Sequence, residues 1–195
     1  MVVRLDPEIN NTYFSWHVYV VGLLPGVFYG WRTDGPGDTA KTGHRFDREK
    51  ILVDPVARTV SDTLWDRNRA ILPGDNCAAS IGAMVIEEDG YDWEEDVPLN
   101  RPSEEMVIYE MHVGGFTRHS SSGVSHPGSF SGVTEKIPYL KALGITDIEL
   151  LPVMAFDEQC VPEGSRSLGL KNYWGYCTHS FFAPHPGYCV DESCK

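Results

Sequence analysis

Two apolar runs, MVIYEMHV (106–113) and ITDIELLP (145–152), enclose the most informative part of the sequence for the fold. Both runs have the length of a strand, and polar or glycine-containing segments flank them. The second run is hydrophobic almost without interruption, which is typical of a parallel strand buried on both faces. The two runs therefore predict neighbouring parallel strands joined by a crossover connection.

The connection between these runs carries the signals of a helix. After a loop rich in glycine and serine, Val133, Ile137 and Leu140 stand at spacings i, i+4 and i+7, and Gly144 stands where a helix C-cap is expected. Pro138 interrupts the pattern, so we expect it to bend the helix or to start a second helical segment. Strand, helix and strand predict one βαβ unit, the opening of an α/β sheet or barrel.

The sequence before this unit indicates short strands and few helices. Residues 13–31 alternate aromatic and β-branched side chains and are broken at Gly22 and at Pro25-Gly26, which predicts two strands joined by a turn. Residues 51–58 predict a further short strand that Pro55 ends. This part of the chain is therefore expected to form a sheet.

Residues 78–101 mix acidic side chains with glycine and proline and show no period, so we expect a connecting segment there. The sequence thus predicts three parts. They are a β-rich region over residues 1–75, a connection over 76–104, and an α/β region over 105–195.

The composition excludes some function classes. The 195 residues include 28 acidic and 16 basic side chains, giving a formal net charge of −12, which would repel nucleic-acid phosphates. A neutral ligand such as a sugar would be indifferent to that charge. No apolar run reaches the roughly 20 residues that span a bilayer, so we expect no membrane partner.

The cysteines form an odd set without CxxC spacing: Cys77, Cys160, Cys177, Cys189 and Cys194. The histidines do not combine with them into a recognisable zinc pattern, so no metal or cofactor is expected. We interpret the cysteines as free thiols in a reducing compartment. A local pair between Cys189 and Cys194 is an alternative that no redox motif supports.

Several longer motifs resemble one enzyme family. YEMHVGGFTRHSSSGVS (109–125), EKIPYLKALGITDIELLPV (135–153) and NYWGYCTHSFFAPHPGY (172–188) are similar to the start of the catalytic barrel in isoamylase-type debranching enzymes of the α-amylase superfamily. The upstream motifs resemble the end of the glycogen-binding-like β-sandwich that precedes this barrel. These motifs are YGWRTDGP (29–36), GHRF (43–46) and LVDPVAR (52–58).

The resemblance implies a fold. It is the C-terminal part of an all-β immunoglobulin-like sandwich, followed by the first βαβ unit of an incomplete (β/α)8 barrel. It also implies hydrolysis of α-1,6 branch linkages in glycogen or amylopectin-like glucans, so a branched α-glucan is the expected partner. The resemblance favours the cytoplasm or the plastid stroma over secretion.

The catalytic groups of this family are not expected in the chain. Retaining hydrolysis needs a carboxylate nucleophile and an acid/base carboxyl group about 5 Å apart. The family carries them after later barrel strands, and a complete barrel takes roughly 250 residues. Catalytic residues are therefore expected beyond Lys195, and the chain resembles an internal piece of a longer enzyme.

The aromatic stretch 172–188 supplies the candidate sugar-binding residues, because a pyranose ring packs its C–H face on an aromatic ring. Tyr176 matches the family tyrosine that stacks beneath the glucose next to the cleavage point. Trp174 and Asn172 are expected mainly to shape the loop. His112, at the end of the first apolar run, is a weaker candidate that the residue type alone favours as a packed structural histidine.

Other polar and aromatic residues have a structural interpretation. Glu110 and Glu149 lie inside the two strands and are expected to be structural or salt-bridging, whereas Asp157 and Glu158 are expected to be solvated. Trp16, Trp31 and Tyr29 could form a glucan-binding platform, but core packing is favoured. The remaining histidines show no metal-ligand spacing; they are His119, His126, His179 and His185.

Other functions remain open at this point. A non-catalytic glucan-binding or regulatory protein would keep the sandwich motifs and Tyr176. A trehalose-releasing relative of the same superfamily would share the first barrel strand and helix. A third outcome is a chain that does not fold alone, because a single βαβ unit leaves apolar faces and a strand edge uncovered.

Overall fold

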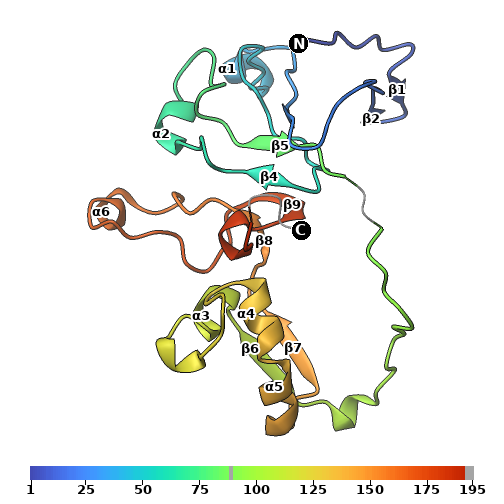
Figure 1. Ribbon diagram of the computed structural model, residues 1–195. Coiled ribbons are helices and arrows are strands. Elements are labelled where there is room, and N and C mark those ends of the chain that lie inside the picture. The colour runs from blue at the N-terminus through green and yellow to red at the C-terminus, as the bar shows by residue number, and fades with distance from the viewer. Residues whose placement is uncertain (88–89, 192–195) are drawn as a thin grey trace.

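The computed structural model describes residues 1–87 and 90–191, and its elements form three tiers (Figure 1). The first tier holds the N-terminal strands with α1 and α2, the second is the β8–β9 hairpin with α6, and the third is the βαβ unit with α3. An extended segment around residues 90–107 runs along one side and joins the first tier to the third. Within the described ranges the strands form small separate sheets, and none closes into a barrel.

The helices and strands are short, and in chain order they are β1 (Asn11–Thr12), β2 (Ser15–Trp16), β3 (Phe28–Tyr29), α1 (Thr39–Thr42), β4 (Val60–Ser61), α2 (Arg67–Ala70), β5 (Gly82–Met84), β6 (Ile108–Met111), α3 (Val113–Phe116), α4 (Phe130–Glu135), α5 (Ile137–Leu143), β7 (Asp147–Leu150), β8 (Met154–Phe156), α6 (Glu163–Arg166) and β9 (Thr178–Pro184). No helix in the described ranges is long and apolar enough to cross a membrane.

The βαβ unit is confirmed. Strands β6 and β7 pair in parallel, with Ile108 opposite Asp147 and Met111 opposite Leu150. The intervening helix is divided into α4 and α5, and Pro138 lies in the first turn of α5, so the proline starts a second segment. Gly144 caps α5 in the left-handed conformation, with φ of 88°, as its place in the sequence predicts.

The expected burial of these strands is wrong for this chain. Ile108 is 56% exposed, and Ile148 and Leu150 are each 41% exposed. The sequence pattern is that of strands covered on both faces, but a sheet of two strands with one helical pair leaves one face open to solvent.

The N-terminal strands differ in position from the expectation. The tight turn between paired strands lies at Tyr13, with φ of 56°, between β1 and β2, rather than at Gly22 or Pro25-Gly26. Strand β3 pairs instead with the distant β5, Tyr29 lying opposite Ala83. The expected strand over residues 51–58 is reduced to one bridge between Leu52 and Trp31.

Strand β5 lies within the range that the acidic composition assigns to a connecting segment. It is nevertheless the central strand of the β3-β5-β4 sheet, and Ala83 is fully buried. The composition of this segment does not reveal the strand, because only three of its residues pair and they show no periodic pattern. The extended connection in the structure therefore starts after β5.

Two apolar clusters hold the tiers together. The first joins the N-terminal sheet to the hairpin, with Val60 and Ala83 packed near Ala155 and Ala183. These alanines are small, which lets the two backbones approach closely. The second cluster joins the hairpin to the βαβ unit through Val113, Phe156 and Tyr188. The β8–β9 hairpin thus contributes residues to both clusters.

Candidate sugar-binding loop

The candidate site is the loop that joins β8 to β9, residues 157–177. The amide of Asp157 donates a 2.8 Å hydrogen bond to the carbonyl of Cys177, which closes the base of the loop. A disulfide between Cys160 and Cys177 closes it a second time, with Cα atoms 6.4 Å apart. We call this segment the aromatic loop because it carries Tyr173, Trp174 and Tyr176.

The disulfide corrects the expectation of free thiols. Cysteine spacing along the chain does not reveal this pair, because the hairpin geometry and not a CxxC motif brings the two residues together. Cys77 is a free, exposed thiol. The suggested partner of Cys189, Cys194, lies outside the described residues.

Asn172 and Gly175 shape the tip of the aromatic loop. The backbone N–H of Asn172 donates to the Glu158 carbonyl at 2.8 Å, and its side-chain Nδ2 donates to the Asp157 carbonyl at 3.1 Å. Its side-chain oxygen accepts from the backbone N–H of Gly175 at 3.3 Å. Gly175 has φ of +85°, a conformation that favours glycine. A β-carbon there would lie 2.9 Å from a ring carbon of Phe156.

Replacing Gly175 with alanine is expected to lower the free energy of unfolding by about 2 kcal/mol, because strain at positive φ and overpacking add. Urea denaturation measures the change. Gly169→Ala is the matched control, since Gly169 has φ of +73° but its β-carbon would meet no atom within 4 Å. Equal losses in the two variants would show that Phe156 does not restrict this position.

The turn at Gly175 presents the neighbouring aromatic side chains to solvent. Tyr176 is 72% exposed and Trp174 is 55% exposed. Tyr173 is half exposed, and its ring centroid lies 5.4 Å from that of Trp174 in an edge-on arrangement. Aromatic faces that remain accessible beside a rigid turn can pack against the C–H face of a sugar ring.

His112 anchors the aromatic loop to the carboxyl end of β6. Its ring stacks on Tyr173, with centroids 4.0 Å apart and planes inclined by 7°. Nδ1 accepts from the Gly115 amide at 2.9 Å, and Nε2 lies 2.7 Å from the Tyr173 carbonyl oxygen. An amide only donates and a carbonyl only accepts, so the proton is assigned to Nε2.

A buried aromatic cluster supports His112 from below. The Tyr188 hydroxyl lies 3.1 Å from His112 Nε2. Burial, with the nearby Tyr173 and Glu158, raises the pKa of Tyr188 to about 12, so the hydroxyl keeps its proton at neutral pH. The neutral hydroxyl can therefore keep its hydrogen bond with the His112 ring.

Asp157 is not solvated as expected but buried, with 2% of its surface exposed. Trp65 Nε1 donates to Oδ1 at 2.8 Å, and Arg67 Nη1 donates to Oδ2 at 2.5 Å. Burial by itself would raise the pKa of the Asp157 carboxyl, but the groups around it, first the His179 ring and the Trp65 indole, hold it well below its usual range. His179 Nε2 lies 3.9 Å from Oδ1, which is beyond hydrogen-bond distance.

Glu158 is also less solvated than expected. Its side chain is 34% exposed, and its carboxylate lies 2.5 Å from Lys171 Nζ and 3.7 Å from Nε2 of the buried His185. The His185 ring lowers the pKa of Glu158, burial opposes it, and Lys171 adds to the lowering, which brings the pKa to about 2. Both acidic residues therefore organise the base of the aromatic loop.

Comparison with known proteins places this geometry in context. No protein-family model matches the chain. Isoamylase 1, chloroplastic, of Arabidopsis thaliana is 42% identical over 194 residues, which are 98% of this chain and 24% of that protein. The isoamylase 1, chloroplastic, of Oryza sativa subsp. japonica is 39% identical over 183 residues, 93% of this chain and 22% of that protein.

The chain is a homologue of the isoamylases. The resemblance drawn from the sequence motifs is thereby confirmed. Among solved structures, the pullulanase complexed with maltotriose from Anoxybacillus sp. LM18-11 matches with a TM-score of 0.53 and 27% identity, covering 74% of this chain and 20% of that one. The chain spans about a quarter of the length of the curated isoamylases that it matches.

Glu110 and Glu149 of this isoamylase homologue are brought together by the sheet. They are opposite each other in the parallel register of β6 and β7, and both are exposed. They lie within the strands and not in the loops that follow them. In the described residues, no group of histidine, cysteine and acidic side chains could hold a metal ion.

Among the N-terminal aromatics of the isoamylase homologue, Tyr29 packs against the core. It donates to Asp54 at 3.0 Å; burial and this bond raise its pKa to about 12. Trp31 is partly buried beside Leu52, and Trp16 is 49% exposed on β2.

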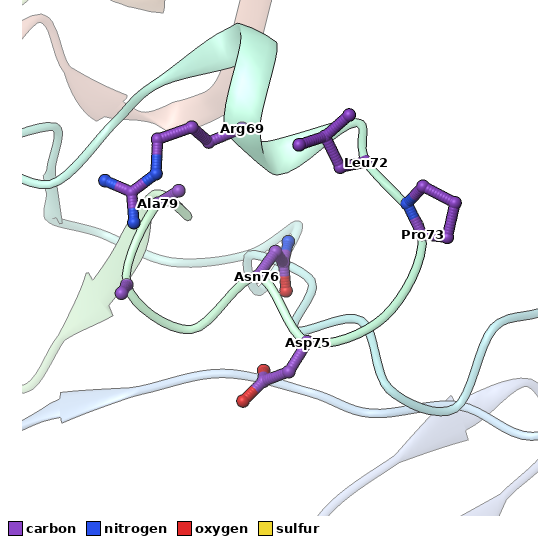
Figure 2. Close-up of a pocket in the computed structure, with 7 residues that line it drawn as sticks. Arg69, Leu72, Pro73, Asp75, Asn76 and Ala79 are labelled. Atoms are coloured by element: carbon purple, nitrogen blue, oxygen red, sulfur yellow. The ribbon is translucent and has the colours of Figure 1, made fainter.

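A small depression of about 200 Å³ lies between α2 and the turn that follows it (Figure 2). Two of its polar side chains are already paired: Asp75 with Arg32 at 3.0 Å, and Asn76 with both backbone groups of Ile51. No aromatic ring lines it, and it is smaller than the pockets that usually hold small ligands. It is therefore not the candidate site of the isoamylase homologue.

Sequence reasoning missed two residues of the site. Tyr173 follows Asn172 in the quoted motif, but only the fold stacks it on His112. Asp157 follows a strand, where acidic residues are usually solvated, and its partners lie about ninety residues earlier in the chain. The sequence offered no local signal for either contact.

Proposed function

We propose that this chain is a segment of a debranching glycoside hydrolase that acts on α-1,6 branch linkages of glucans. Homology to isoamylases at 42% and 39% identity supports this activity, and the structural likeness to a pullulanase supports it independently. Within such an enzyme the segment would bind the glucan, while the catalytic carboxylate pair comes from residues beyond Lys195.

The finer architecture is part of the proposal. Residues before the extended connection would form the end of an immunoglobulin-like sandwich, and the βαβ unit would be the first of a (β/α)8 barrel. Of the parts predicted from the sequence, 1–75, 76–104 and 105–195, the boundary at 104/105 would stay. The sandwich part would extend from residue 75 to the end of β5 at Met84, because β5 is the central strand of its sheet. The exposed apolar residues of β6 and β7 support it, because barrel strands are covered on both faces.

The observation that carries the proposal is the exposed Tyr176 beside the left-handed Gly175, on a loop fixed at the carboxyl end of β6. In α/β barrels, ligands bind at the carboxyl ends of the strands. We propose that Tyr176 stacks on a glucose ring, that Trp174 flanks it, and that His112 holds the loop in place without touching the sugar.

Replacing Tyr176 with alanine is expected to weaken binding to glycogen about tenfold, because the variant loses an aromatic face that packs on the sugar. Affinity electrophoresis in glycogen-containing gels measures the dissociation constant. Tyr139→Ala is the matched control, since Tyr139 is an exposed tyrosine on α5. Unretarded migration of the folded wild-type chain, or equal retardation of both variants, would overturn the proposed contact.

The same samples test whether the chain is catalytic on its own. The chain is expected to release no linear glucans from glycogen, as measured by reducing ends after incubation. Release that is lost in a Glu110→Gln or Glu149→Gln variant would contradict the proposal that the catalytic carboxylates lie elsewhere.

A further inference from the structure

We propose that Asp157 is a positioning residue through which Trp65 and Arg67 of the N-terminal region set the conformation of the aromatic loop and so its affinity for glucan. The inference rests on the proposed function, because it assumes that Tyr176 contacts a sugar. It goes further by assigning the N-terminal region, which forms the first tier, a role in a site on the second tier (Figure 1).

The side chain of Asp157 is bound by residues of the N-terminal region. Each carboxylate oxygen accepts from one residue of that region, Oδ1 from the Trp65 indole at 2.8 Å and Oδ2 from Arg67 at 2.5 Å. The carboxylate is 2% exposed, whereas the Arg67 side chain is 40% exposed. Hydrogen bonds to a charged group are stronger than bonds between neutral groups, so these two bonds hold the Asp157 side chain strongly.

The backbone of Asp157 belongs to the aromatic loop. Its amide donates to the Cys177 carbonyl at 2.8 Å, and its carbonyl accepts from Asn172 Nδ2 at 3.1 Å. The Asn172 side-chain oxygen in turn accepts from the amide of Gly175, the residue between Trp174 and Tyr176. A continuous series of bonds therefore connects Arg67 to the tip of the loop.

Gln159 provides a second link of the same kind. Its side chain donates to the Trp65 carbonyl at 2.7 Å and accepts from the Arg67 amide at 2.9 Å, while its own amide donates to Asp157 Oδ1 at 2.9 Å. Two neighbouring residues of the loop are thus bound to the same two residues of the N-terminal region. Such paired contacts hold one relative position of the two segments and disfavour others.

Removing the Arg67 side chain is expected to make the aromatic loop less ordered. Without Arg67, the Asp157 carboxylate loses a charged partner while it stays buried, so conformations that release Asp157 toward water become more populated. Those conformations also release Asn172 and the turn at Gly175. Because the glucan would bind only the ordered loop, its apparent affinity falls by the fraction that is disordered.

Arg67→Met is the test variant, with Arg32→Met as its matched control. Arg32 also pairs with an aspartate, Asp75 at 3.0 Å, and donates to backbone carbonyls of the N-terminal region, but it has no bond to the aromatic loop. Arg67→Lys keeps the charge, so it is expected to retain most of the wild-type loop order and glucan affinity. All are made in the 195-residue chain.

Two readouts are used. Hydrogen exchange followed by mass spectrometry is expected to show faster exchange over residues 171–178 in Arg67→Met, with the βαβ unit unchanged. Titration calorimetry with maltoheptaose is expected to show about fivefold weaker binding, and no further weakening when Arg67→Met is added to Tyr176→Ala.

The outcomes separate the inference from the proposed function. If maltoheptaose binds the wild type and Tyr176→Ala weakens it, but Arg67→Met changes neither binding nor exchange at 171–178, the inference is overturned alone. If exchange rises throughout the chain, Arg67 is a general stability residue and the inference fails. If the wild type does not bind maltoheptaose, the proposed contact fails and the inference with it, whatever the exchange shows.

Discussion

Asp157→Ala is expected to lower the free energy of unfolding by about 3 kcal/mol, the largest effect of any single substitution considered. The variant removes a buried carboxylate that accepts from Trp65, Arg67 and the Gln159 amide. Bonds to a charged group contribute about 1.5–3 kcal/mol each, and a buried donor left without a partner adds a cost. The 40% exposure of Arg67 limits the sum, because water can solvate the released guanidinium.

Guanidinium or urea denaturation followed by tryptophan fluorescence measures this change. Asp75→Ala is the matched control, since it removes an aspartate that pairs with Arg32 at the surface. Water and salt screen exposed pairs of this kind, so we expect a much smaller loss in this control. A loss in Asp157→Ala no greater than in Asp75→Ala would contradict the role assigned to the buried carboxylate.

The same carboxylate predicts the acid sensitivity of the fold. The pKa of Asp157 is lower in the folded chain than the ordinary aspartate value of about 4, so the folded state binds fewer protons than the unfolded state below that pH. Its stabilisation is present above about pH 4 and is lost as the pH falls toward its folded pKa. Glu158, with a pKa of about 2, contributes in the same direction.

Denaturation at a series of pH values between about 5 and 2 tests the sign. The free energy of unfolding is expected to fall with pH in the wild type and to fall less steeply in Asp157→Asn, which cannot titrate. Parallel slopes in the two proteins would show that Asp157 has the same pKa folded and unfolded.

The second large effect concerns the disulfide. Removing the Cys160–Cys177 bond, as in the double variant Cys160→Ser with Cys177→Ser, is expected to lower the free energy of unfolding by about 3 kcal/mol. The bond closes a sequence separation of 17 residues, and cross-linking a loop of this size restricts the unfolded chain. The aromatic loop loses one of its two closures, so its exchange over residues 171–178 is also expected to rise.

Denaturation without reductant measures the difference, with Cys77→Ser as the control because Cys77 is a free, exposed thiol. The control is expected to change the stability by less than about 0.5 kcal/mol. Mass spectrometry after alkylation without reduction gives an independent check. Alkylation of both Cys160 and Cys177 in the native wild type, or equal stability of all three proteins, would exclude the bond.

The two effects and the further inference concern one segment. The aromatic loop is held at its base by the disulfide and by Asp157, and at its tip by Asn172 and Gly175. Tyr173 adds the stack on His112 that fixes the loop at the end of β6. A sugar-binding surface that is rigid before the ligand arrives loses little conformational entropy on binding.

The candidate site was predictable in part. Trp174 and Tyr176 were candidates because their residue types suit a sugar ring and their motif resembles isoamylases, and the structure leaves both exposed. Asn172 was expected to shape the loop, and its bonds to Glu158, Asp157 and Gly175 do so. The burial of Asp157 was not predictable, because its hydrogen-bond partners lie 90 and 92 residues away in the sequence.

The elements that can be predicted from the sequence are those whose signals are local. The period of Val133, Ile137 and Leu140, the missing amide of Pro138 and the positive φ available to Gly144 define the helical pair of the βαβ unit and its end. Three contacts are evident only in the folded chain: the pairing of β3 with β5, the bond between Cys160 and Cys177, and the bond between Arg67 and Asp157. The physical reason is that helix periodicity and backbone sterics act between near neighbours, whereas these pairings depend on which distant segments can share a core.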